Sequence, residues 1–319
     1  MDIDILLALQ NFRNSVSLAF NGVVEALRTL GEPVALMAVA CVLLWGVDKK
    51  SGYYIMLNCA WGLIINQFIK ITACVYRPWV RDARLIPAGA ALDTATGYSF
   101  PSAHTTIAVA MWGGMGVNLG KRRRWLLFVG VGVSLIIAFS RMYVGVHTPQ
   151  DVLVSAVIGI ALLWATQRVM EWIERNPGKD GMVAATGMAL AAILAVYAAV
   201  KSYPMDYAAS GELLVDPEEM KNDVFVTVGI TAGFFAGWLI ERRFIKYSVS
   251  GTLITRIIRV AIGFAILMAL LKTLGPSLAF LGMEMANIVT YAALILFATV
   301  LYPIVFTKAE RIIKSRRKT

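Results

Sequence analysis

The chain has 319 residues, 58% of them hydrophobic, and a mean hydropathy of +0.69. Because soluble domains hold about 45–50% apolar residues, this composition excludes an ordinary soluble domain and indicates a membrane protein. The formal net charge is +10. The basic residues lie in short connections between apolar runs, as in cytoplasmic loops of membrane proteins, so we expect no nucleic-acid partner.

In residues 1–32, apolar and polar side chains alternate at helical spacing, which predicts an amphipathic helix lying on the membrane surface. Apolar runs that approach or exceed the length needed to cross a bilayer follow. The fold predicted is an all-α polytopic membrane protein. It has about nine transmembrane helices, near 33–47, 53–72, 101–119, 125–140, 148–171, 181–200, 224–240, 257–274 and 287–307.

The polar clusters divide the chain into three expected parts. Residues 1–32 form the interfacial helix, and residues 33–180 hold every cluster with chemical character. Residues 181–319 form a C-terminal extension of four membrane helices without such a cluster. We interpret the extension as scaffold or as the surface of a homodimer, with a lipid-handling role as the alternative.

Lys and Arg are concentrated on alternate connections, which predicts the orientation of the chain. The basic connections, all expected to be cytoplasmic, are 48–50, 121–124, 241–259 and the tail 308–319. This arrangement places the N-terminus outside and the C-terminus in the cytoplasm. The polar connections 73–101 and 141–147 then share the extracytoplasmic face.

One polar stretch, residues 140–151, reads SRMYVGVHTPQD and lies between two apolar runs. His147 and Asp151 are four residues apart, so they share a helix face if the second helix begins near Thr148. Asp151 can then hold the imidazole. A histidine held by a carboxylate beside a fixed cation, here Arg141, is suited to nucleophilic attack on a phosphate.

Two further clusters precede this stretch. Lys70 and Arg77 are seven residues apart, which places them on nearly one face of a helix, and both suit phosphate oxygens. Pro101 is expected in the first turn of the next helix, with Ser102 as N-cap and His104 facing an anion at the helix start. Taken singly, the cations could be snorkelling side chains and His104 a buried histidine bonded to a carbonyl.

Together the clusters supply cations, a helix terminus, a hydroxyl, two histidines and a carboxylate. This inventory fits phosphoryl transfer through a covalent phosphohistidine, which depends on positioning and on stabilising charge on the phosphate oxygens. A metal site would need more carboxylates or histidines on this face, so we expect no metal and no other cofactor.

The pattern resembles the three-part signature of the type 2 phosphatidic acid phosphatase superfamily, over roughly residues 30–172. The matching parts are Lys70-x6-Arg77-Pro78, Pro101-Ser102-x-His104 and Ser140-Arg141-x5-His147-x3-Asp151. Ala103 stands where that family most often has glycine, and it keeps the backbone N–H. Nine spans with an outer N-terminus resemble the glucose-6-phosphatase and sphingosine-phosphate phosphatase branches.

The resemblance implies a role for each residue. His147 is the nucleophile, Asp151 orients it, and His104 protonates the leaving-group oxygen and then activates water. The phosphate oxygens are held by Lys70, Arg77, Ser102 and Arg141.

The resulting hypothesis is a membrane phosphatase acting on a lipid monophosphate or diphosphate at the extracytoplasmic face, with that lipid phosphate and the membrane lipids as partners. Two alternatives remain: a phosphatase of a soluble phosphate such as a sugar phosphate, and a non-catalytic transporter or flippase that uses the same phosphate site. Charged residues inside the spans would favour transport, and the chain has almost none beyond the signature.

Overall fold

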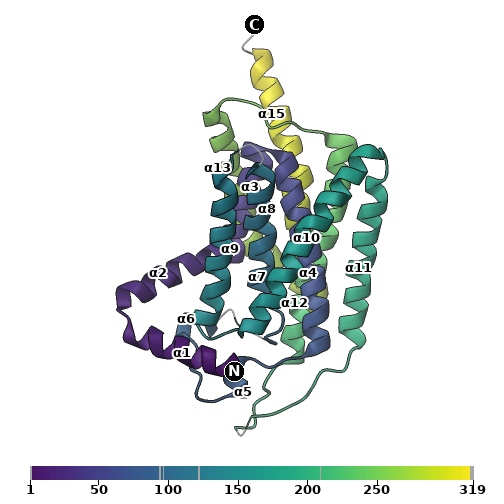
Figure 1. The fold of residues 1–319 in the computed structure, drawn as a ribbon. Helices are drawn as coiled ribbons and strands as arrows, with labels where there is room; N and C mark the ends of the chain where they lie inside the picture. The colour runs from purple at the N-terminus through teal and green to yellow at the C-terminus, as the bar shows by residue number, and fades with distance from the viewer. Residues whose placement is uncertain (1, 93–94, 96, 121–122, 209, 317–319) are drawn as a thin grey trace.

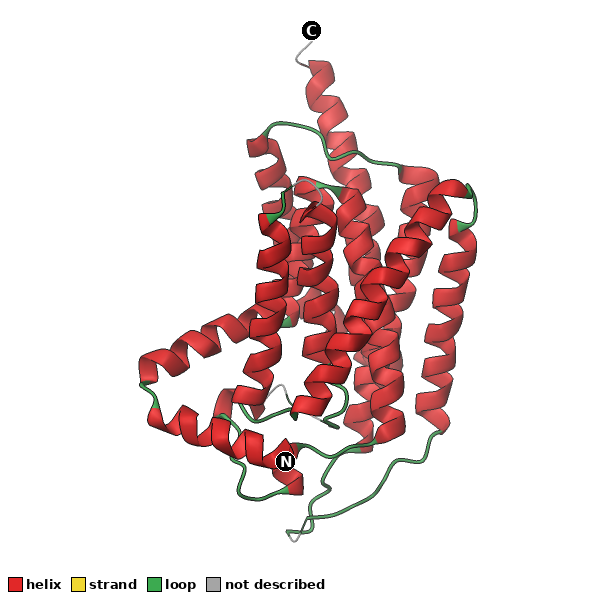
Figure 2. Cartoon of the chain, in the orientation of Figure 1, coloured by secondary structure: helices red, strands yellow, loops and turns green. Residues whose placement is uncertain are grey.

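The computed structural model describes residues 2–92, 95, 97–120, 123–208 and 210–316. Within these residues the chain is helical and contains no β-strand, which confirms the predicted all-α class (Figure 2). Long helices pack side by side along one axis, while α1 and α2 project from one end of the bundle (Figure 1).

The N-terminal half consists of short helices around three long ones. Its elements are α1 (Asp2–Ser15), α2 (Leu18–Arg28), η1 (Thr29–Gly31), α3 (Pro33–Val42), η2 (Leu43–Val47), α4 (Lys49–Ala73), α5 (Pro78–Arg81), α6 (Gly89–Leu92), α7 (Ala103–Ala108), η3 (Val109–Gly113), α8 (Gly114–Gly120), α9 (Trp125–Tyr143) and α10 (Pro149–Arg175). The C-terminal half consists of α11 (Asp180–Val200), α12 (Pro217–Ile240), η4 (Glu241–Ile245), α13 (Leu253–Ser277), η5 (Ala279–Leu281), α14 (Met283–Leu296), η6 (Phe297–Leu301) and α15 (Tyr302–Arg316).

The described part of the chain has seven helices long and apolar enough to cross a membrane, or eight if the bent pair Leu18–Gly31 and Pro33–Val47 forms one span. The chain is therefore a multi-pass membrane protein, but the predicted count of nine is not confirmed. The expected span at 33–47 is short and bends by 56° from the helix before it. The expected span at 101–119 is a succession of α7, η3 and α8.

The predicted single amphipathic helix at the N-terminus is two helices, which corrects that expectation. The chain turns after Ser15, and Ser17 caps α2 by accepting a hydrogen bond from the Phe20 N–H at 3.3 Å. A hydroxyl that can satisfy a free backbone N–H favours a new helix start at this point. The Arg13 guanidinium then reaches the Tyr143 carbonyl at 3.1 Å, so α1 is tied to the end of α9.

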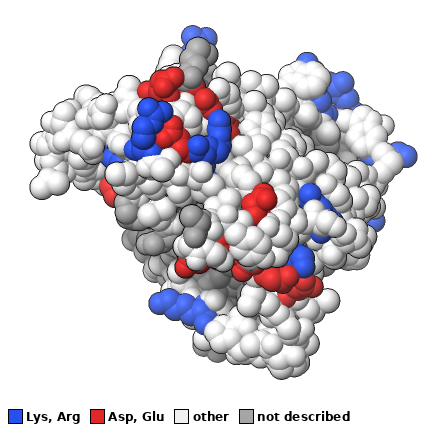
Figure 3. All heavy atoms as spheres, turned by 90° about the horizontal axis from the view of Figure 1, so that it is seen from below, with Lys and Arg blue, Asp and Glu red and all other residues white. Residues whose placement is uncertain are grey.

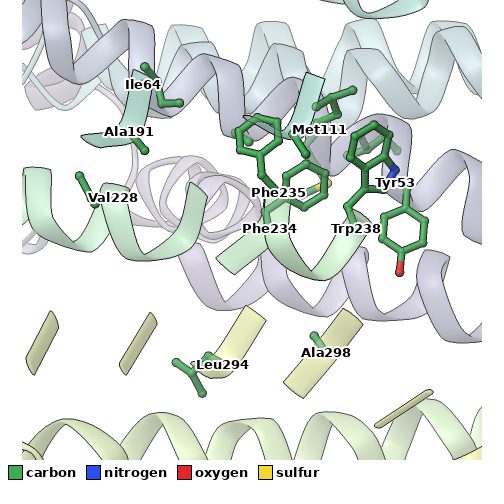
Figure 4. Close-up of a cluster of buried hydrophobic side chains, with 14 of the residues drawn as sticks. Tyr53, Ile64, Met111, Ala191, Val228, Phe234, Phe235, Trp238, Leu294 and Ala298 are labelled. Carbon is green, nitrogen blue, oxygen red and sulfur yellow. The ribbon is translucent and has the colours of Figure 1, made fainter. Parts of the chain in front are cut away.

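Helix α12 lies at the centre of the buried core. Its ring side chains Phe234, Phe235 and Trp238 are almost fully buried, and they share one cluster with Tyr53 and Ile64 of α4 (Figure 4). Since lipid is as apolar as these side chains, close packing rather than escape from water holds such a cluster together in a membrane. The C-terminal extension is thus packed directly against α4, which carries part of the site.

Small residues let α12 approach α14 closely. A Cβ placed on Gly229 would lie 2.6 Å from the Ile288 carbonyl oxygen, and one on Gly233 would lie 2.8 Å from the Ala292 Cα. Both obstacles are backbone atoms, which do not rotate away. The four-residue spacing of these glycines is the small-xxx-small pattern of tightly packed membrane helices.

Replacing Gly233 with alanine should therefore separate α12 from α14. We expect a loss of about 1–3 kcal/mol, the usual cost of overpacking a well-packed core, seen as a lower melting temperature of the purified protein in detergent. Gly132→Ala is the matched control, because its Cβ would meet nothing within 4 Å. Equal melting temperatures for the two variants would show that this contact does not limit stability.

The two termini lie at opposite ends of the bundle (Figure 1). The N-terminus lies at the same end as α5, α6 and the start of α7. Figure 3 views this end: acidic and basic side chains lie next to one another in several groups on a mostly uncharged surface. Lys121 and Arg122, part of the basic connection 121–124 used to predict orientation, lie outside the described residues.

Candidate active site

The end of α4 supplies the first cation. Lys70 lies in its last turn, is buried, and donates a hydrogen bond from Nζ to the Tyr98 carbonyl at 2.9 Å. The helix stops at Ala73, because Cys74 adopts a left-handed conformation with φ of 47°. The expectation that Lys70 and Arg77 share one helix face is therefore wrong.

Arg77 lies beyond the helix, yet it returns to the same end of the bundle as the buried N-cap of α5. Its Nε donates to the Gly97 carbonyl at 3.1 Å and its Nη1 donates to the Val146 carbonyl at 3.0 Å. These bonds tie the connection after α4 to the turn between α9 and α10. Lys70 and Arg77 are thus brought to the same end of the bundle by contacts between distant segments, and not by their spacing along one helix.

Ser102 is the N-cap of α7, as predicted, and its Oγ accepts from the Thr105 N–H at 3.4 Å. The helix itself begins at Ala103, so Pro101 precedes it instead of occupying its first turn. The Ser102 N–H reaches the Asp151 carbonyl at 3.4 Å, which joins the start of α7 to the start of α10.

Helix α10 begins at Pro149 with Thr148 as N-cap, close to the predicted position. The Asp151 side chain completes a capping box, accepting from the Thr148 N–H at 2.8 Å on Oδ2. The same Oδ2 lies 3.5 Å from His147 Nδ1 and also accepts a hydrogen bond from the Ser99 hydroxyl. One carboxylate thus fixes the helix start and the imidazole together.

The other edge of the imidazole faces Arg77. The distance from His147 Nε2 to Arg77 Nη1 is 3.1 Å. A guanidinium only donates hydrogen bonds, so Nε2 carries the lone pair and Nδ1 carries the proton that faces Asp151. This neutral tautomer has its nucleophilic nitrogen directed at a cation, where a phosphate would bind.

Burial, together with the neighbouring Arg77 and despite Asp151, holds the pKa of His147 well below its usual range. Protonation at low pH would remove the nucleophile, and a lowered pKa moves that loss to lower pH. We therefore predict that the acid limb of the kcat/KM profile lies below pH 6.5. An acid limb at or above that value would contradict the neutral buried imidazole.

Arg141 projects from the last turn of α9 and is 1% exposed. Its Nε and Nη1 have no hydrogen-bond partner among the residues that the structure describes. Two buried donors without a protein acceptor are costly unless a ligand accepts from them. Arg141 is therefore suited to bind an anion beside His147, whose backbone N–H donates to the Arg141 carbonyl at 3.3 Å.

His104 lies in the first turn of α7 and is more exposed than His147, with 18% of its side chain accessible. Its neighbour is Glu32, whose Oε1 lies 3.9 Å from His104 Nε2. All seven residues predicted from the sequence thus lie at the same end of the bundle: at the end of α4, in the N-caps of α5 and α7, at the start of α7, at the end of α9, in the turn before α10 and in the first turn of α10. His104 is at the more accessible side of this group.

Sequence reasoning missed Ser99 and Glu32. Ser99 precedes the second part of the signature, and nothing in its spacing marks it as a partner of Asp151. Glu32 was placed at the end of the interfacial helix, far in sequence from His104. Its side chain also contacts Arg28 at 2.5 Å, and this four-residue spacing could have marked the two as neighbours on a helix.

Replacing Ser99 with alanine should weaken the hold on Asp151. Losing one hydrogen bond to a buried carboxylate costs about 1.5–3 kcal/mol, so we expect kcat to fall about tenfold to a hundredfold. Ser140→Ala is the control, since within the described part of the chain that hydroxyl bonds the Ile137 carbonyl of its own helix, at 2.7 Å. Phosphate release by both variants would be compared, and equal rates would mean that Ser99 does not support the site.

Comparisons with known proteins agree with this geometry. Residues 51–175 match the PAP2 superfamily model, and residues 225–315 match the model of a PAP2 superfamily phosphatase transmembrane extension. An undecaprenyl-diphosphatase of Bacillus subtilis is 33% identical over 150 residues, which cover 44% of this chain and 72% of the relative. The chain belongs to the PAP2 superfamily.

A second relative of this PAP2 superfamily member is an undecaprenyl-diphosphatase of Sulfolobus acidocaldarius, 26% identical over 157 residues, or 48% of this chain and 71% of the relative. No solved structure matches the chain. The family resemblance seen in the sequence is confirmed, and every predicted site residue falls within the matched residues 51–175. Glu32 lies outside them.

Proposed function

We propose that this PAP2 superfamily member is an integral membrane phosphatase that hydrolyses a lipid phosphomonoester or diphosphate through a phosphohistidine. The observation that carries the proposal is the setting of His147, with Nδ1 facing Asp151 at 3.5 Å and Nε2 facing Arg77 at 3.1 Å. An imidazole held on one side with its lone pair directed at a buried cation is arranged for attack on phosphorus.

In the first step the phosphate oxygens accept hydrogen bonds from the Arg77 guanidinium in place of carbonyl oxygens of the protein. They also accept hydrogen bonds from Nε and Nη1 of Arg141. His147 Nε2 attacks phosphorus, the bond to the leaving oxygen breaks, and protonated His104 gives that oxygen its proton. In the second step neutral His104 takes a proton from water, and the water oxygen displaces the imidazole. Inorganic phosphate leaves with both histidines restored, so protons and electrons balance.

An apolar groove on the side of α9, the helix whose last turn carries Arg141, is consistent with a lipid substrate. It lies between α2 and α9, has a volume of about 310 Å³, and is lined by Val24, Leu27, Leu135, Ile136 and Phe139. An alkyl chain could lie in this groove, which is formed in part by α9, the helix that also carries Arg141. A sugar phosphate would gain nothing from such a surface.

The two matched relatives are named undecaprenyl-diphosphatases, which makes a polyprenyl diphosphate the first substrate to test. We further propose that the site faces outside the cytoplasm. The Lys and Arg bias predicts this, and the opposite placement of the termini supports it (Figure 1).

Phosphate release by the purified protein across a panel of phosphates tests the function. The panel is a polyprenyl diphosphate, phosphatidic acid, phosphatidylglycerophosphate, sphingosine phosphate and glucose 6-phosphate. We expect release from one or more lipids and none from glucose 6-phosphate. Release from the sugar alone would overturn the lipid assignment. If folded protein released no phosphate from any member of the panel, the proposed phosphatase function would be contradicted.

A further inference from the structure

Glu32 stands between the N-terminal helices and the site. It is the residue at which the chain leaves η1 and enters α3, and 22% of its side chain is exposed. Its Oε1 is shared by two neighbours: Arg28 Nη1 at 2.5 Å and His104 Nε2 at 3.9 Å. The carboxylate therefore links α2 to the imidazole at the start of α7.

The backbone around Glu32 is held firmly in place. The Leu30 carbonyl accepts a hydrogen bond from Trp112 Nε1 at 3.2 Å. A Cβ placed on Gly31 would lie 2.9 Å from Ile137 Cγ2, so this turn packs directly on α9. Arg28 is also bound by Glu25 at 2.6 Å and is buried. These contacts fix where the Glu32 carboxylate can lie.

His104 otherwise faces positive charge. Burial, together with the positive charges of Arg141 on α9 and Arg77 at the start of α5, lowers the pKa of His104 to about 4 and so disfavours its protonated form. A general acid must carry its proton when the leaving group departs. Glu32 is the neighbouring carboxylate that acts in the opposite direction, because a negative charge beside an imidazole favours the imidazolium.

We propose that Glu32 is the positioning residue of the general acid. Its carboxylate accepts a hydrogen bond from Nε2–H of His104, so that the proton on Nδ1 is the one given to the leaving oxygen. The inference rests on the proposed phosphatase reaction. The 3.9 Å separation closes to a hydrogen bond when the substrate is bound, as catalytic hydrogen bonds often do. After the leaving oxygen takes the Nδ1 proton, the same nitrogen accepts one from water.

Glu32→Gln keeps the size of the side chain and removes its charge. On a lipid with an alkoxide or phosphate leaving group, kcat should fall about tenfold to a hundredfold, the usual contribution of a weakened acid. On an aryl phosphate, whose leaving group needs little protonation, the loss should be under about threefold. The basic limb of the pH profile should move to lower pH, and Glu32→Asp should restore part of the activity.

Glu25→Gln is the matched control. It removes a carboxylate from the same Arg28, but Glu25 is 37% exposed and its Oε1 bonds Arg28 instead of facing His104. Its activity and pH profile should stay close to those of the unmodified protein. Equal losses for Glu32→Gln on aryl and alkyl substrates, with an unchanged basic limb, would reduce Glu32 to a structural role and overturn the inference.

A second measurement does not depend on turnover. The chain has two histidines, so in a His147→Gln background the imidazole NMR signals belong to His104 alone. Adding Glu32→Gln should lower the titration midpoint of those signals by about one pH unit, whereas adding Glu25→Gln should not. An unchanged midpoint would overturn the inference. If no lipid is hydrolysed, the proposed function fails, and this titration still decides the role of Glu32.

Discussion

Replacing His147 with alanine should abolish phosphate release, with a loss of at least about 10³-fold in kcat. The imidazole is the acceptor of the phosphoryl group in the proposed mechanism, and it is held between Asp151 at 3.5 Å and Arg77 at 3.1 Å. The residual rate would come only from binding and charge stabilisation by the cations. Steady-state release from the preferred lipid, measured with matched amounts of folded protein, gives the result.

His147→Gln is the companion variant, because it fills more of the buried space than alanine. Both variants should be inactive. Activity within about tenfold of the unmodified protein in either one would mean that water attacks phosphorus directly, and the phosphohistidine would have to be abandoned.

Replacing Asp151 with asparagine should lower kcat by about 10³–10⁴-fold, as loss of the orienting carboxylate does in other carboxylate–histidine pairs. The amide oxygen can still accept from the Thr148 N–H, so the start of α10 should persist. What disappears is the negative charge that faces His147 Nδ1 and stabilises the phosphorylated imidazole. The loss should appear in kcat more than in KM.

Thr148→Ala separates this effect from helix capping. It removes the hydroxyl that accepts from the Asp151 N–H at 3.2 Å, at a cost of about 0.5–2 kcal/mol in stability. It leaves the carboxylate beside His147. We expect a lower melting temperature with most of the activity retained; a loss as large as that of Asp151→Asn would show that the helix start, and not the charge, governs turnover.

Local rules predicted the parts of the site that are built locally. The apolar run predicted a helix near 148–171, and α10 begins at Pro149, so His147 and Asp151 come together as their four-residue spacing required. Ser102 was predicted as an N-cap because serine commonly takes that position. Both predictions depend on residues within one turn of each other.

The rest depends on features that spacing does not encode. Cys74 ends α4 in a left-handed conformation without being glycine, so the helix face that Lys70 and Arg77 were predicted to share does not form. Glu32 meets His104 only through packing between distant segments. The count of nine spans is not confirmed, because the runs at 33–47 and 101–119 form successions of shorter helical segments, which hydropathy does not show.

Trapping the phosphorylated protein tests the central claim most directly. A ³²P-labelled aryl phosphate would be given to His104→Ala, which should form the intermediate but hydrolyse it slowly, and the reaction would be stopped in alkali, where phosphohistidine survives. We predict label on the peptide that contains His147, and none when His147→Ala is added. Labelled inorganic phosphate produced with no labelled protein at any time would contradict the account.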